Sequence, residues 1–260
     1  MIVTSTKTAW CCAARIQTLT ENLDGINFDI EHNSGNKDAL TALVKETRAG
    51  LTKAGDGRLY QVSFATNIFP KNHANGYDMA AMAEYLDFFV PMGYDMCWGT
   101  KSAKPNDPIK SLAAGVAQYT ADLKISPSQV VLGLPWYSWS FPCDSGNPGD
   151  ACTVTPPKGN PWYGYAKQIT FTRVISDLEN SRNVSSVVFD SDTATKHYDV
   201  IEAGKRHQVW FDDPETLTPK YQMAKAAGLR GVAFWHAGCV NYTAADGQAR
   251  AMWDALKHFF

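Results

Sequence analysis

Three polar side chains at alternate positions, Asn27, Asp29 and Glu31, have the types and spacing that acid–base catalysis could use. Successive side chains of a strand point to opposite faces, so these three would share one face and the apolar residues between them the other. Neighbouring members of the row would lie about 6–7 Å apart. Acids on a buried strand are costly unless they are paired or used, which favours acid–base chemistry. On alternation alone, a strand with a solvent-facing polar edge is an equal alternative.

Short apolar runs that alternate with helix-like segments position this row. The expected strands are Gly25–Ile30, Tyr60–Thr66, Phe88–Tyr94, Val130–Trp136 and Gly231–Trp235. The expected helices are Ala9–Leu23, Asp38–Ala54, Met79–Tyr85, Ile109–Leu123 and Pro219–Ala227. This alternation predicts βαβ units and a parallel sheet, an α/β fold. Glu31 would then follow the carboxyl end of its strand, where barrel enzymes place catalytic residues.

The stretch between the fourth and fifth strands is longer than one barrel repeat needs. We interpret residues 138–213 as a small β-rich insertion within a single domain that spans residues 1–260. The insertion begins with a loop rich in Gly and Pro, Cys143–Pro161, and Val187–Phe189 and His207–Phe211 are expected to be short antiparallel strands.

Length and composition allow one large domain. The chain has 260 residues, of which 45% are hydrophobic, enough for a sizeable core. A net charge of −2 gives no sign of a nucleic-acid or anionic-lipid partner. The 8 Trp and 11 Tyr residues could serve as stacking platforms for sugars or as an aromatic core. No apolar run is long enough to cross a membrane.

The cysteines point to structure, not to metal chemistry. None of the six forms a CxxC pair, which argues against zinc or thioredoxin-like chemistry. Cys143 and Cys152 flank a short loop and are candidates for a disulfide. That pair and the sequons at Asn183 and Asn241 favour an oxidising compartment, although the first residues lack the pattern of a signal peptide.

Several motifs together resemble glycoside hydrolase family 18. The string Asp24–Glu31 (DGINFDIE) resembles the family's DGxDxDxE signature, with Asn27 where most members have Asp. Met92–Asp95 (MGYD) resembles its MxYD motif, and Gly133–Tyr137 (GLPWY) its GxPWY segment. The resemblance runs from about Trp10 to the C-terminus.

The resemblance implies a (β/α)8 TIM barrel that is partial here. Strands four to eight are present, whereas the residues before Gly25 leave no room for strands one to three. Such a sheet would expose unpaired edges, so we expect self-association. By resemblance the location is lysosomal or secreted.

The resemblance also implies a reaction. It is hydrolysis of β-1,4 N-acetylglucosamine linkages, in the chitobiose core of glycans or in chitin oligosaccharides, by a retaining, substrate-assisted mechanism. Glu31 would be the acid and base. Asp29 would orient the acetamide, and Asn27 would hydrogen-bond Asp29 without adding a charge. Tyr94 would donate its hydroxyl to the acetamide oxygen.

Further substrate contacts follow from the same resemblance. Asp95 would line the pocket and Trp235 would form its floor, with Trp136 and Asp24 as additional binding residues. Tyr94, Trp136 and Trp235 could instead be core residues. No metal or cofactor is implied, and the expected partner is an oligosaccharide that contains N-acetylglucosamine. The alternative is a catalytically inactive sugar-binding or vestigial protein.

Overall fold

The computed structural model describes Thr18 and residues 21–31, 35–53, 57–73, 76–155, 166–180, 182–245 and 247–260. The expected helix Ala9–Leu23 lies largely outside these residues, as do Cys11 and Cys12. The chain divides into two compact units. Unit 1 comprises residues 1–92, 114–132 and 228–231, and unit 2 comprises residues 93–113, 133–227 and 232–260.

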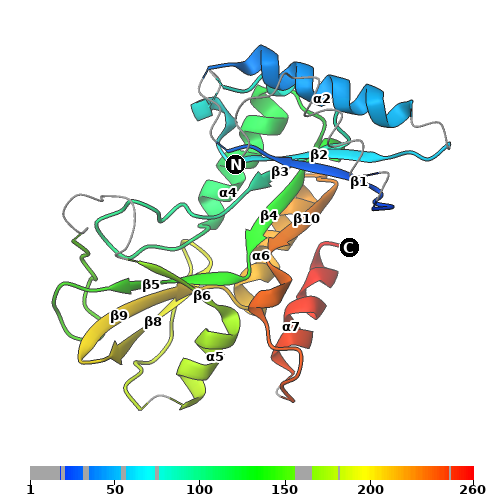
Figure 1. Ribbon diagram of the computed structural model, residues 1–260. Coiled ribbons are helices and arrows are strands. Elements are labelled where there is room, and N and C mark those ends of the chain that lie inside the picture. Colours follow the sequence, from blue (N-terminus) through cyan, green and yellow to red (C-terminus); the bar gives the residue numbers. More distant parts are fainter. Residues whose placement is uncertain are drawn as a thin grey trace. The chain divides into compact units, whose positions relative to one another are not determined.

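Parallel strands form the sheet of unit 1. Strands β1 (Gly25–Asp29), β2 (Gln61–Asn67) and β3 (Phe88–Met92) are neighbours in that order. β1 and β2 run side by side in Figure 1. The sheet continues with β4 (Val131–Pro135) and β10 (Gly231–Trp235), which begin in unit 1 and end in unit 2. All five expected strands are confirmed, in an open sheet of the described residues.

Amphipathic helices accompany this sheet in unit 1. Helix α2 (Lys37–Thr52) starts at Asn36, whose side chain accepts a hydrogen bond from the Ala39 N–H at 3.1 Å. One stripe of α2 is buried, namely Leu40, Val44, Thr47 and Leu51. The other helical elements are η1 (Pro70–His73), α3 (Met79–Ala83) and η3 (Pro127–Gln129).

The expected helix Ile109–Leu123 changes its hydrogen-bonding pattern part of the way along. It is α-helical in α4 (Ile109–Ala117) and continues as a π-turn, η2 (Gln118–Asp122). The π-turn contains Tyr119, which is fully buried and whose hydroxyl lies 2.7 Å from Thr66 Oγ1 and 2.5 Å from the Asn67 carbonyl oxygen. The wider turn therefore accompanies a tyrosine tied to the end of β2.

Unit 2 contains an antiparallel sheet of order β6-β5-β9-β8-β7. Its strands are β5 (Tyr137–Pro142), β6 (Lys167–Thr170), β7 (Val188–Asp190), β8 (Thr195–Glu202) and β9 (Lys205–Phe211). Strands β8 and β9 are joined at Ala203 and Gly204, whose φ angles of 49° and 77° are those of a tight type I′ hairpin. The expected β-rich region between the fourth and fifth parallel strands is confirmed, although the domain boundaries remain a prediction.

The helices of unit 2 differ from expectation. Helix α6 (Pro214–Ala226) begins at Pro214 and not at Pro219, because Asp213 caps it and forms a capping box with Thr216. Helices α5 (Phe171–Asn180) and α7 (Gln248–Asp254) were not expected. Two 3-10 turns complete the unit, η4 (Ala237–Cys239) and η5 (Ala255–His258). Among the helices that the structure describes, none is both long and apolar enough to cross a membrane.

Candidate active site

The polar row of β1 has the predicted alternation. Asn27 and Asp29 are exposed, whereas Phe28 between them is 8% exposed and packs on Phe64 of β2, with ring centroids 5.9 Å apart. Glu31 is exposed and lies two residues beyond Asp29, the last residue of the strand. Asn27 and Asp29 thus lie on the exposed face of β1, and Glu31 follows the carboxyl end of the strand.

Two hydrogen bonds fix the backbone and the amide in this row. The Oδ1 atom of Asn27 accepts a hydrogen bond from the buried Ser63 hydroxyl at 2.9 Å. The Tyr77 hydroxyl donates to the carbonyl of Ile30, the residue between Asp29 and Glu31, at 2.5 Å. Tyr77 was not among the candidates, because it lies before α3 in a segment without a periodic pattern.

The amino end of β1 has a structural role. A Cβ atom at Gly25 would lie 2.1 Å from the Gln61 carbonyl oxygen, so only glycine fits against β2 here. Asp24 is exposed and forms an ion pair with Arg58 at 2.9 Å. Seven residues separate Asp24 from Glu31, roughly 23 Å along an extended strand. Asp24 thus lies at the opposite end of β1 from Glu31, and its role in substrate binding stays a prediction.

In unit 2, Asp95 is the centre of a hydrogen-bonded cluster. Its Oδ1 atom accepts hydrogen bonds from the Tyr137 hydroxyl and from the Trp139 indole N–H, the latter at 3.0 Å. Its backbone N–H donates to Asn106 Oδ1 at 2.6 Å. The Tyr94 ring meets the Tyr137 ring edge to face, with centroids 5.9 Å apart. The structure therefore brings Tyr94 and Asp95 together with Tyr137 and Trp139.

Burial sets the electrostatics of this cluster. Burial raises the pKa of the Asp95 carboxyl above its usual value, and the hydrogen bonds from Tyr137 and Trp139 counteract part of that rise. Burial, followed by the adjacent Asp95 carboxylate, raises the pKa of Tyr137 far above its usual range. Tyr137 is therefore a permanent hydrogen-bond donor to Asp95 at any physiological pH.

The two tryptophans that were predicted to bind the substrate, Trp136 and Trp235, lie in different surroundings. Trp136 is 1% exposed, stacks on Phe234 with centroids 3.9 Å apart, and donates its indole N–H to the Tyr221 hydroxyl at 3.3 Å. It has no free face for a sugar, so the structure gives it a packing role. Trp235, at the end of β10, is 55% exposed.

The predicted disulfide is present. Cys143 and Cys152 are bonded, with their Cα atoms 5.0 Å apart, and both are buried with Phe141 and the free thiol of Cys97. Arg206 also holds the loop that they close, because its guanidinium donates hydrogen bonds to the carbonyl oxygens of Ser145 and Asp150. The same guanidinium pairs with the buried Asp199 at 3.0 Å.

A charged triad is buried in the same unit. Lys220 Nζ lies 2.8 Å from Asp107 Oδ2 and 2.5 Å from Asp212 Oδ1. Burial and the Asp212 carboxylate raise the pKa of Asp107 well above its usual range. Burial alone would lower the pKa of Lys220, but the two carboxylates raise it. No motif or periodic pattern in the sequence joins these three residues.

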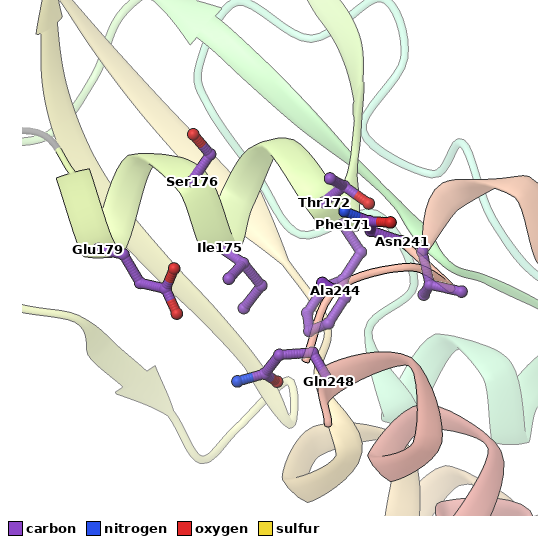
Figure 2. A pocket seen from close by; sticks show the side chains of 9 residues that line it. Phe171, Thr172, Ile175, Ser176, Glu179, Asn241, Ala244 and Gln248 are labelled. Atoms are coloured by element: carbon purple, nitrogen blue, oxygen red, sulfur yellow. The ribbon is translucent and has the colours of Figure 1, made fainter. Parts of the chain in front are cut away.

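A separate hollow in unit 2 contains none of the predicted site residues. It has a volume of about 330 Å³ and lies between α5 and the segment that leads into α7. Figure 2 shows Ile175 and Glu179 of α5 facing Ala244 and Gln248. Among the described residues, no three His, Cys, Asp or Glu side chains are grouped in a way that could hold a metal ion.

Solved structures define the fold class. A family 18 chitinase from Cycas revoluta, solved with allosamidin, matches with a TM-score of 0.80 at 17% identity, over 98% of this chain and 73% of that one. An N-acetylglucosaminidase of the same family from Paenibacillus barengoltzii matches with a TM-score of 0.75 at 20% identity, over 96% of this chain and 77% of that one. The fold is thus that of the TIM-barrel glycosidases, present in part.

The chain belongs to the glycosyl hydrolases of family 18, whose family model matches residues 7–239. Its class is therefore that of the glycosidases. It is similar to the di-N-acetylchitobiases of Mus musculus (34% identity over 90% of this chain) and Homo sapiens (31% over 96%). It spans 67% and 68% of the length of these two relatives.

Proposed function

We propose that this chain hydrolyses β-1,4 linkages of N-acetylglucosamine, in the chitobiose core of glycans or in chitin oligosaccharides, with Glu31 as the acid and base. The observation that carries the proposal is the row Asn27, Asp29 and Glu31 on one face of β1, with Glu31 beyond the carboxyl end of the strand. The similarity to di-N-acetylchitobiases, at 31–34% identity, supports this substrate class.

The proposed mechanism has two steps, and the substrate supplies its own nucleophile. In the first step the 2-acetamido oxygen attacks the anomeric carbon, while Glu31 gives its proton to the departing glycosidic oxygen. In the second step Glu31 takes a proton from water, which attacks the oxazolinium-type intermediate and opens it. The sugar is released with its original anomeric configuration, and Glu31 regains its proton.

The neighbours of Glu31 would serve the acetamide group. Asp29 accepts from the acetamide N–H and stabilises the positive charge of the intermediate. Asn27 is already tied to Ser63 through Oδ1 and has its N–H₂ group available as a donor to Asp29. In unit 2, we assign Tyr94 as a donor to the acetamide oxygen, Asp95 as a ligand of sugar hydroxyls and Trp235 as a stacking platform. Location in a lysosome or outside the cell stays a prediction.

Release of N-acetylglucosamine from chitobiose and chitotriose tests the proposal. Glu31→Gln should slow release by about 10²–10⁴-fold, the usual contribution of a general acid. Glu46→Gln removes an exposed carboxylate from α2 and should leave the rate unchanged. Equal release by the wild type and Glu31→Gln would show that Glu31 is not the acid.

A second function is favoured by one observation. The parallel sheet of the described residues is open. This favours an inactive protein that binds sugar without cleaving it. Binding of chitotriose by a wild type that releases no sugar is the result that this second function predicts.

A further inference from the structure

Asp95 has a backbone conformation that something must maintain. Its φ angle is 60°, in the left-handed region that residues other than glycine seldom adopt. Its N–H donates a 2.6 Å hydrogen bond to Asn106 Oδ1, and the next N–H, that of Met96, donates to the Asn106 carbonyl oxygen at 3.0 Å. Asn106 therefore holds two successive backbone amides of this turn.

Asn106 is itself fixed in place. Asn106 is 2% exposed, and the residue after it, Asp107, is fully buried and paired with Lys220. A side chain in such a position cannot swing away to follow the turn at 95–96. The buried pair of Asp107 and Lys220 thus restrains Asn106, and Asn106 in turn restrains the backbone of Asp95.

The Asp95 carboxylate depends on that backbone. Both of its hydrogen bonds, from Tyr137 and from Trp139, are made by Oδ1. These two donors come from β5 and fix Oδ1 only if the Cα–Cβ bond of Asp95 points towards that strand. The second oxygen, Oδ2, then has a set direction.

We propose that Asn106 is a positioning residue that acts through Asp95: it fixes the left-handed turn and thereby aims Asp95 Oδ2 at the sugar. The effect of Asn106 on catalysis rests on the proposed function, whereas its effect on the geometry of Asp95 does not. A merely structural asparagine would affect the free energy of unfolding but not the geometry of the Asp95 carboxylate.

The first arm of the test reads the geometry without any activity. The Trp139 indole N–H reports on Asp95 Oδ1, and the Trp210 indole, bonded to Gln208 at 3.0 Å, is an internal reference. In a ¹H–¹⁵N correlation spectrum, Asn106→Ala should shift the indole N–H resonance of Trp139. It should leave the indole N–H resonance of Trp210 unchanged. Thr172→Val removes a comparable bond, to the Cys239 carbonyl at 3.1 Å, and should move neither.

The second arm is a double-mutant cycle on the hydrolysis of chitotriose. Asn106→Ala should raise KM by about fivefold to tenfold, the effect of one hydrogen bond, with a smaller change in kcat. In the Asp95→Ala background the same substitution should change KM by less than about twofold, because the group through which Asn106 acts is gone.

Each outcome decides the proposal. An unshifted Trp139 resonance, or equal effects on KM in the two backgrounds, overturns it. A wild type that releases no sugar refutes the proposed function, and the indole arm alone then decides whether Asn106 fixes Asp95. If Asn106→Ala does not fold, Asn106→Ser takes its place in both arms, since it shortens the side chain and keeps a polar group.

Discussion

The ammonium group of Lys220 lies 2.8 Å from Oδ2 of Asp107, and neither side chain has any exposed surface. Asp212 Oδ1 lies 2.5 Å from the same ammonium. Two buried carboxylates thus share one cation, and burial followed by the Asp212 carboxylate raises the pKa of Asp107 well above its usual range. Three charges in the interior are costly, so a comparison of two substitutions tests whether Asp107 holds a proton at pH 7.

We therefore expect Lys220→Met and Asp107→Asn to differ greatly. Lys220→Met leaves Asp212 as a buried charge without its cation and should lower the free energy of unfolding by about 3–5 kcal/mol. If Asp107 holds a proton at pH 7, Asp107→Asn exchanges one neutral group for another and should have a much smaller effect. Urea denaturation of both variants at pH 7 makes the comparison, and equal losses would contradict a protonated Asp107.

The raised pKa of Asp95 predicts a pH dependence of stability. Because the folded-state pKa lies above the unfolded value of 3.8, the stabilising contribution is complete below that value and is lost as pH rises through the folded-state pKa. The free energy of unfolding of the wild type, minus that of Asp95→Asn, should therefore fall as the pH rises above about 4. Denaturation of both proteins across this range tests the sign, since the other titrating groups cancel in the difference. A constant difference would contradict it.

Gly25 should be irreplaceable in the sheet. In Gly25→Ala the new Cβ would lie 2.1 Å from the Gln61 carbonyl oxygen, so β1 and β2 would have to separate. We expect a loss of stability at or above the roughly 1–3 kcal/mol of ordinary overpacking. Gly231→Ala is the matched control in the same sheet, because its Cβ would meet Val131 at 3.8 Å, an ordinary contact. In thermal unfolding, Gly25→Ala should melt at a clearly lower temperature than Gly231→Ala. Similar melting temperatures would show that β1 can move away from β2 at little cost in stability.

The disulfide should contribute about 2–3 kcal/mol, the loop-entropy value for cysteines 9 positions apart. The variant with both Cys143→Ser and Cys152→Ser should lose this amount in urea denaturation. Wild type in excess dithiothreitol should match the variant, and a wild type that keeps its advantage when reduced would mean that the serines destabilise by another route.

The sequence predicted well whatever depended on local pattern. The five parallel strands were recognisable as apolar runs, and the row at Asn27, Asp29 and Glu31 followed from their period of two. The predicted start of α6 at Pro219 is wrong, because Asp213 caps the helix and Pro214 begins its first turn. That signal is local, since an Asp followed directly by Pro is typical of a helix start.

Contacts between distant residues could not be predicted. Tyr137 and Trp139 bond to Asp95 across 42 and 44 positions, and no periodic pattern links such residues. Trp136 illustrates the same limit, since the sequence alone does not distinguish a tryptophan stacked on Phe234 in the core from one that faces a sugar. The sequence identifies Trp136 as an aromatic residue, but the exposure of its side chain depends on the fold.

The hydrogen bond between Asn27 and Ser63 ties β1 to β2 without an ionisable group. An amide neither gains nor loses a proton in the physiological range, so the link between β1 and β2 persists at any pH at which the sheet is folded. The row therefore carries two carboxyl groups, those of Asp29 and Glu31, and the link between β1 and β2 depends on neither of them.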